Sequence, residues 1–97
     1  MVREKRWSLR ADQDRREIED YWTNRNKSNT YSIKLDTLFR EGVKLLSYAP
    51  EIGIITKYPS VRFSIIRDYL VYYRIGSDYI EIITIWDSRR NPKKFKL

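Results

Sequence analysis

Hydrophobic and polar residues follow two different periodicities along this chain. Trp7 and Leu9 alternate with polar neighbours, which predicts a short half-buried strand over residues 6–10. Over residues 11–24 and again over residues 31–48, apolar residues recur at three- and four-residue spacing, which predicts two helices. Because only a short polar loop joins them, we expect the two helices to pack as an antiparallel hairpin.

The second half of the chain has the composition of β-strands. Pro50 ends the second predicted helix, and β-branched and aromatic residues then dominate residues 61–67, 69–75 and 79–86. The tripeptide at residues 76–78, Gly-Ser-Asp, is typical of a hairpin turn. We therefore predict one α+β domain over residues 1–97 with element order β-α-α-β-β-β. Its antiparallel sheet would be covered on one face by the helical hairpin, and a short basic tail would follow.

Alternation along the predicted strands assigns residues to the two faces of the sheet. Leu70, Tyr72 and Arg74 share one face of their strand, and Ile82 and Thr84 share one face of the last strand. An arginine beneath the helices would be costly to bury, so Arg74 marks the open face. On the neighbouring strand Arg62 would join it there, which predicts a basic and partly aromatic open face. The alternative for Arg62 and Arg74 is a structural ion pair with an acidic residue of the sheet.

Composition restricts the chemistry. The 97 residues include 41% hydrophobic side chains, enough for one core, but no cysteine and no histidine. Disulfides, thiolate sites and histidine acid–base chemistry are thereby excluded, and we expect no cofactor and no metal. The longest apolar runs are too short to cross a bilayer, and the charged N-terminus is not followed by a signal-type apolar region. We therefore expect a cytoplasmic protein without membrane contact.

Positive charge is concentrated toward the C-terminus. Residues 1–56 carry eleven basic and nine acidic side chains, whereas residues 57–97 carry nine basic and four acidic ones. This asymmetry favours a polyanionic partner, either nucleic acid or an acidic protein segment. In the tail, Arg89, Arg90 and Lys93 are candidate contacts, with a solvated terminus as the alternative. Tyr72 could stack on a base or serve only in packing.

Several segments together resemble the RelE/ParE superfamily of type II toxin–antitoxin toxins. The similarity extends from Trp7 to Lys94 and rests on "RWSLRA", "DRREIEDYWTNRN", "LLSYAPEIG", "SVRF", "YLVYYRI" and "IEIITIWDSRRNP", in that order. The resemblance implies a compact toxin that is neutralised by a cognate antitoxin, whose C-terminal segment wraps the helices and sheet. It also implies that operator DNA is contacted only through the antitoxin.

The superfamily divides by target, and this chain departs from its ribonuclease branch. RelE-like members cut mRNA in the ribosomal A site, but Leu70 stands here where they have an arginine, and Asp87 stands where the strongest nucleases have a histidine. Lys57 also stands alone where some members carry a lysine pair. ParE-like members poison DNA gyrase, and Arg62, Arg74 and the ending Arg-Arg-Asn-Pro at residues 89–92 resemble their pattern.

The resemblance therefore favours a ParE-like toxin that binds DNA gyrase, with no catalytic residue assigned. The candidate contact residues for target or antitoxin are Arg62, Tyr72, Arg74, Arg89, Arg90 and Lys93. One alternative is a RelE-like, ribosome-dependent mRNA endonuclease, in which Arg62, Tyr72 and Arg74 would stabilise the scissile phosphate. A second is a non-toxic basic module that binds nucleic acid. One departure concerns the helices, because Arg15 stands where the first helix of the family usually has a leucine.

Overall fold

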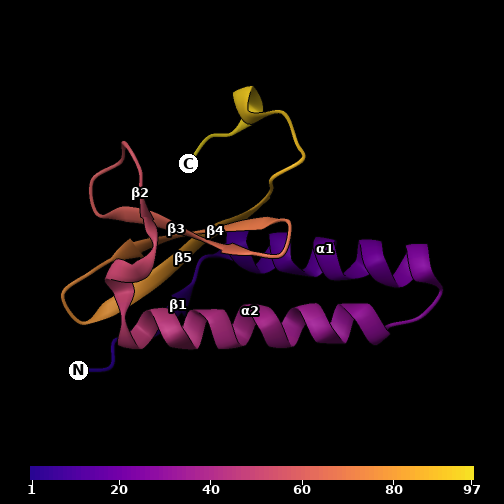
Figure 1. The fold of residues 1–97 in the computed structure, drawn as a ribbon, viewed down its shortest axis with the longest axis horizontal. Coiled ribbons are helices and arrows are strands. Elements are labelled where there is room, and N and C mark those ends of the chain that lie inside the picture. The colour runs from indigo at the N-terminus through magenta and orange to yellow at the C-terminus, as the bar shows by residue number, and fades with distance from the viewer.

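A computed structural model describes residues 1–97, apart from the side chain of Pro92. Two helices lie on one side of a five-stranded sheet, and the C-terminal tail lies on the other side (Figure 1). The elements in chain order are β1 (Glu4–Trp7), α1 (Leu9–Asn26), α2 (Thr30–Tyr48), the 3-10 turn η1 (Pro50–Ile52), β2 (Ile54–Ile55), β3 (Val61–Ile66), β4 (Tyr69–Ile75), β5 (Tyr79–Asp87) and the 3-10 turn η2 (Pro92–Lys94).

The predicted α+β class and the helical hairpin over one face are confirmed. The strand order in the sheet is β1-β5-β4-β3-β2, and all neighbours are antiparallel except β1 and β5, which run parallel. The sheet is therefore mixed. The two-residue strand β2 at one edge was not predicted, because a run this short carries no recognisable alternation.

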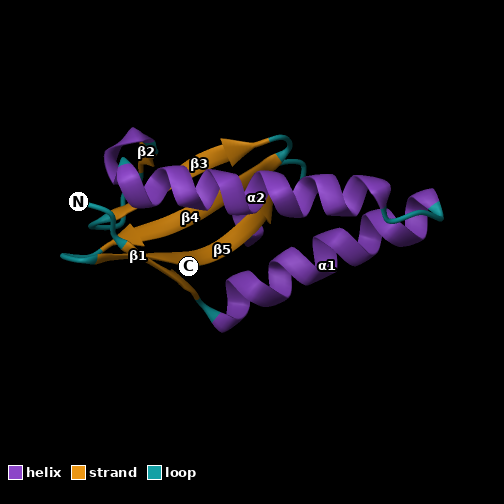
Figure 2. Cartoon of the chain, turned by 90° about the horizontal axis from the view of Figure 1, so that it is seen from below, coloured by secondary structure: helices purple, strands orange, loops and turns teal.

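The first strand ends earlier than predicted because Ser8 caps the helix that follows. Its hydroxyl oxygen accepts a hydrogen bond from the backbone N–H of Ala11 over 3.0 Å, as an N-cap residue does. The same hydroxyl donates to the carbonyl oxygen of Ile83 over 2.7 Å. This second bond fixes the start of α1 against β5, so α1 runs next to β5 while α2 crosses the sheet (Figure 2).

The hydrophobic core lies between α2 and the sheet. α2 buries Leu35, Phe39, Val43 and Leu46, whereas the only fully buried residue of α1 is Ala11. The sheet contributes fully buried residues from its two central strands: Tyr69, Val71, Tyr73, Ile80, Ile82 and Ile85. α1 adds the indole of Trp22, whose Nε1 donates to the hydroxyl of Tyr69 over 2.8 Å.

A β-bulge in β5 changes which residues share a face. Tyr72 lies opposite Thr84, but the next residue of β4, Tyr73, lies opposite Ile82, so Ile83 is the extra residue. Ile82 therefore faces the helices with Tyr73, while Thr84 shares the face of Tyr72. The prediction that Ile82 and Thr84 point the same way is wrong, because one extra residue reverses the alternation that follows.

Candidate functional site

Arg62 and Arg74 lie on opposite faces of the sheet. In the β3–β4 register Arg62 stands opposite Tyr73, whose ring is buried beneath the helices, whereas Arg74 stands opposite Val61. Residues directly opposite in an antiparallel pair point to the same side, so only Arg74 lies on the open face with Tyr72. The expectation that Arg62 joins them there is therefore wrong. The faces of the two arginines are set by the pairing of β3 with β4, which alternation along a single strand does not show.

The guanidinium of Arg62 is used inside the fold. Its Nη1 donates hydrogen bonds of 3.0 Å to the carbonyl oxygens of both Glu51 and Gly53. Beside it, the hydroxyl of Tyr73 donates to the carbonyl oxygen of Pro50 and accepts from the backbone N–H of Gly53 over 3.0 Å. Arg62 thus fixes the η1 turn to the sheet edge, which is a structural task that needs no partner protein.

Tyr72 is partly covered by other aromatic rings. Its ring lies 5.3 Å from the ring of Phe63 and 4.4 Å from that of Phe95, and Phe95 also meets Trp86 edge-on at 5.1 Å between centroids. We call Phe63, Tyr72, Trp86 and Phe95 the aromatic cluster. Burial raises the pKa of Tyr72, so its phenol is neutral at physiological pH. In the isolated chain the ring of Tyr72 thus packs against other aromatic rings.

Arg89 and Arg90, at the start of the tail, contact different side chains. Arg89 forms a bidentate pair with Asp87, with Nε–Oδ1 and Nη2–Oδ2 distances of 2.9 and 2.8 Å. This hydrogen bonding lowers the pKa of Asp87, which is therefore an ionised carboxylate and not a proton donor. The guanidinium carbon of Arg90 instead lies 4.3 Å from the centroid of the Trp86 ring. Lys93 is exposed on the η2 turn.

Arg89 and Arg90 also border a groove beside α1. It has a volume of about 400 Å³ and is lined by Asp14, Glu17, Ile18, Tyr21, Tyr69, Ile85, Asp87, Arg89 and Arg90. Asp14 already has two partners there, because Oδ2 accepts from the hydroxyl of Thr84 and from the backbone N–H of Ile85 over 3.1 Å. It caps the edge of β5 beyond the end of β1, so this carboxylate has a structural role.

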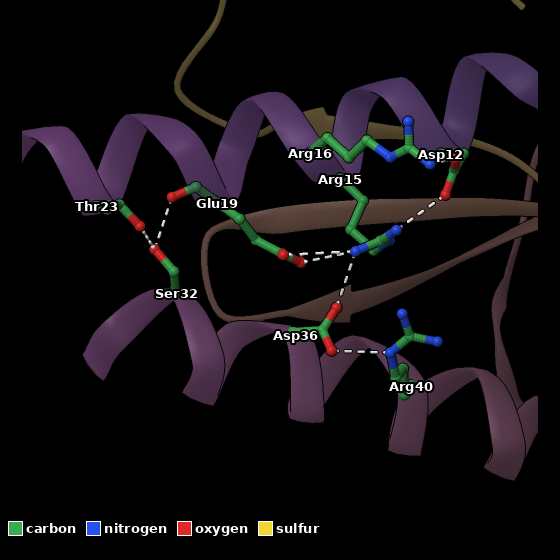
Figure 3. A network of polar contacts seen from close by, with 8 residues as sticks. All are labelled: Asp12, Arg15, Arg16, Glu19, Thr23, Ser32, Asp36 and Arg40. Atoms are coloured by element: carbon green, nitrogen blue, oxygen red, sulfur yellow. Dashed lines mark hydrogen bonds and ion pairs between the residues drawn. The ribbon is translucent and has the colours of Figure 1, made fainter. Parts of the chain in front are cut away.

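A second polar network joins the two helices and lies away from the open face (Figure 3). Arg15 is its centre, with bonds to Asp12 and Asp36 at 2.9 Å and to Glu19 at 3.3 Å. Desolvation, followed by the nearby Asp36 carboxylate, raises the pKa of Glu19 to about 7. Arg15 pairs with carboxylates of both helices, and this explains how an arginine fits at this position.

An exposed apolar groove lies between α2 and β3. Its volume is about 380 Å³, and its lining is Leu38, Glu41, Gly42, Leu45, Ile65, Ile66 and Arg67. Leu45 is 55% exposed and Ile65 is 60% exposed, values that leave large apolar side chains facing solvent. Such contiguous apolar exposure marks a surface that a partner covers. This groove was not predicted, because its lining comes from α2 and β3, which only the tertiary fold brings together.

The open face offers cations and aromatic rings but no positioned acid–base pair among the residues that the structure describes. Tyr72, Arg74 and Arg90 lie on it, and Asp87 is ionised and held by Arg89. General acid–base chemistry needs a group whose pKa is near neutrality beside the reacting atoms. Glu19, whose pKa is raised to about 7, lies between the helices and away from this face.

Comparison with solved structures finds the same fold in a known protein. A solved structure described as "Chromosomal ParDE TA system from P. aeruginosa" contains a chain of the same fold. It matches with a TM-score of 0.74 at 20% identity, over 87% of this chain and 94% of that chain. A search of curated protein sequences gives no match.

The sequence assigns the family. Residues 6–92 match the family described as "ParE toxin of type II toxin-antitoxin system, parDE". The chain therefore belongs to the ParE toxin family, and the resemblance drawn from its sequence is confirmed. Membership implies an antitoxin partner. None of the helices in the described part of the chain has the length and apolar character needed to cross a membrane.

Proposed function

We propose that this toxin stops growth in the cytoplasm by binding DNA gyrase, without cutting RNA. The observation that supports this proposal is the ion pair between Asp87 and Arg89 at the end of β5. The strongest nucleases of the superfamily carry a proton donor at that position, whereas this carboxylate has a lowered pKa. Without a proton donor at this position the chain lacks a general acid there, which favours action by binding to the target.

The binding surface consists of the open face and the tail. Tyr72, Arg74 and Arg90 lie on that face, Lys93 is exposed on the tail, and Arg89 borders its base. Their positive charges suit an acidic or nucleic-acid-bound surface. Arg62 is not part of this surface, since its guanidinium is bonded to backbone carbonyls on the other face.

The antitoxin binds a different surface, the apolar groove between α2 and β3. A neutralising segment that lays apolar side chains against Leu45 and Ile65 would remove exposed apolar area from water. Arg67 lines the same groove and would pair with an acidic residue of such a segment. Because the two surfaces are separate, the antitoxin binds the toxin through residues that the target does not contact.

Controlled expression tests the proposal in cells. We expect the chain alone to arrest growth and to induce a DNA-damage response, with mRNA on translating ribosomes left intact. Co-expression of the adjacent antitoxin gene should restore growth. Site-specific cleavage of that mRNA would instead establish the RelE-like endonuclease, and harmless expression would favour a non-toxic nucleic-acid-binding module.

A further inference from the structure

The C-terminal tail turns back over the open face of its own sheet. After β5 the backbone N–H of Arg90 donates to the carbonyl oxygen of Asp87 over 3.0 Å, and the η2 turn then reverses the chain (Figure 1). This path brings Phe95, the only aromatic residue of residues 88–97, onto Tyr72 and Trp86. The tail thus covers the face that the helices leave open.

The tail is held there mainly by side chains. The backbone N–H of Ser88 donates to the carbonyl oxygen of Asp68 over 2.8 Å and ties this residue to the β3–β4 turn. Beyond it, the hydrogen bonds among the described groups of residues 91–97 are local, such as those from the N–H groups of Lys93 and Lys94 to Asn91. The tail is therefore held on the sheet by the contacts of Phe95 with Tyr72 and Trp86 and by the contact of Arg90 with Trp86.

A small pocket that is open to solvent lies beside the tail. Its volume is about 200 Å³, and it is lined by Leu70, Tyr72, Trp86, Ser88, Arg90 and Phe95. The described residues of the tail beyond Ser88 make no ladder hydrogen bonds to the sheet. Segments with few such bonds and solvent-exposed backbone open locally at low free energy.

We propose that residues 89–97 form an autoinhibitory cover, which places Phe95 on Tyr72 and Trp86 in the free toxin and is displaced when the target binds the open face. This inference rests on the proposed function, in which that face is the target surface. An anionic patch on the target would attract Lys93 and Lys94, which are exposed on the cover. Its apolar groups would then replace Phe95 on Tyr72 and Trp86.

The fraction of toxin molecules in which the cover is open sets the apparent affinity for the target. When only the open state binds, the apparent dissociation constant is the intrinsic one divided by the open fraction. Removing the ring of Phe95 abolishes the main closing contact and raises that fraction. Because a half-buried aromatic ring contributes about one factor of ten in an equilibrium constant, target affinity should rise about tenfold.

The test compares full-length Phe95→Ala with Lys96→Ala, which changes an exposed residue of the same tail. The first measurement is the rate of trypsin cleavage after Arg90, which reports opening without any target. The second is the dissociation constant for purified gyrase. We expect Phe95→Ala to be cleaved about tenfold faster and to bind about tenfold tighter than the natural chain and Lys96→Ala.

Two results would contradict the proposal that residues 89–97 form an autoinhibitory cover. Unchanged cleavage together with a lower midpoint of thermal unfolding would make Phe95 a fixed part of the core. Faster cleavage with weaker gyrase binding would make Phe95 a contact residue for the target. If none of the proteins binds gyrase, the proposed target is wrong, and the cleavage rates still decide whether Phe95 holds the tail closed.

Discussion

Arg15 and Asp36 join the two helices through an ion pair of 2.9 Å between Nη1 and Oδ1 (Figure 3). Arg15 is only 12% exposed, and the same guanidinium also serves Asp12 and Glu19. Asp12 and Asp36 have second partners in Arg16 and Arg40, whereas the ion pair of Glu19 is with Arg15. Removal of Arg15 would therefore leave Glu19, in its partly desolvated position, without a cationic partner.

We predict that Arg15→Leu lowers the free energy of unfolding by about 2–4 kcal/mol, even though leucine is the usual residue of the family at this position. A variant that combines it with Glu19→Gln and Asp36→Asn should return to within about 1 kcal/mol of the natural chain, because the unpaired charges are gone. Urea denaturation of the three proteins measures both values. A single variant as stable as the natural chain would contradict a structural role for the network.

The pH dependence of stability follows from Glu19. Its pKa is raised from 4.5 to about 7 in the folded chain, chiefly by desolvation and then by Asp36. Between these values the folded state holds a proton that the unfolded state has released. The free energy of unfolding should therefore fall as pH rises from 4.5 to 7 and level off above that.

Glu19→Gln removes this titration and should flatten the profile in that window. Carboxylates with lowered pKa values, such as Asp12 and Asp87, lose their stabilising effect only as pH falls through values below 3.8, so they do not interfere. Urea midpoints at pH 5, 6, 7 and 8 provide the measurement. An equal slope in both proteins would show that Glu19 is not the titrating group.

Arg62 and Arg74 should separate stability from binding. Arg62→Ala loses hydrogen bonds to the carbonyl oxygens of Glu51 and Gly53, which should lower the free energy of unfolding by about 1–2 kcal/mol. Arg74→Ala changes an exposed residue and should stay within about 0.5 kcal/mol of the natural chain. Target affinity should fall for Arg74→Ala alone, and the reverse pattern would place the target surface on the other face.

The apolar groove between α2 and β3 gives a prediction for neutralisation. Leu45→Glu should weaken antitoxin binding at least tenfold while growth arrest persists, because a charge replaces apolar area in the contact. Ile33→Glu is the matched control, since Ile33 is 59% exposed on the same helix but does not line the groove. Co-expression with the antitoxin and titration of the purified pair test this, and equal loss in both variants would refute the location.

Sequence periodicity was sufficient for the two helices, for the first strand and the three long strands, and for their order, but not for β2. The strand at residues 69–75 has the predicted limits, and the end of α2 before Pro50 follows from the restriction that proline imposes. These features depend on local properties of the chain. Strand register and the bulge at Ile83 depend on pairing between segments, so the face of Arg62 and that of Thr84 could not be read from alternation.

Several residues of the candidate site could be predicted from the sequence, but their positions in the fold could be predicted less well. Arg74, Arg90 and Lys93 belong to the open face and tail, as the charge pattern indicated. The role of Phe95 was missed, because a single aromatic residue in a basic tail has no periodicity. Its presence among lysines was nevertheless a signal, since a solvated tail has no physical need for an aromatic ring.

The most direct measurement is gyrase supercoiling with the purified toxin. We predict that the natural chain inhibits supercoiling, that added antitoxin reverses the inhibition, and that Arg74→Ala inhibits less at equal concentration. Full supercoiling activity at toxin concentrations that arrest growth in cells would contradict gyrase as the target.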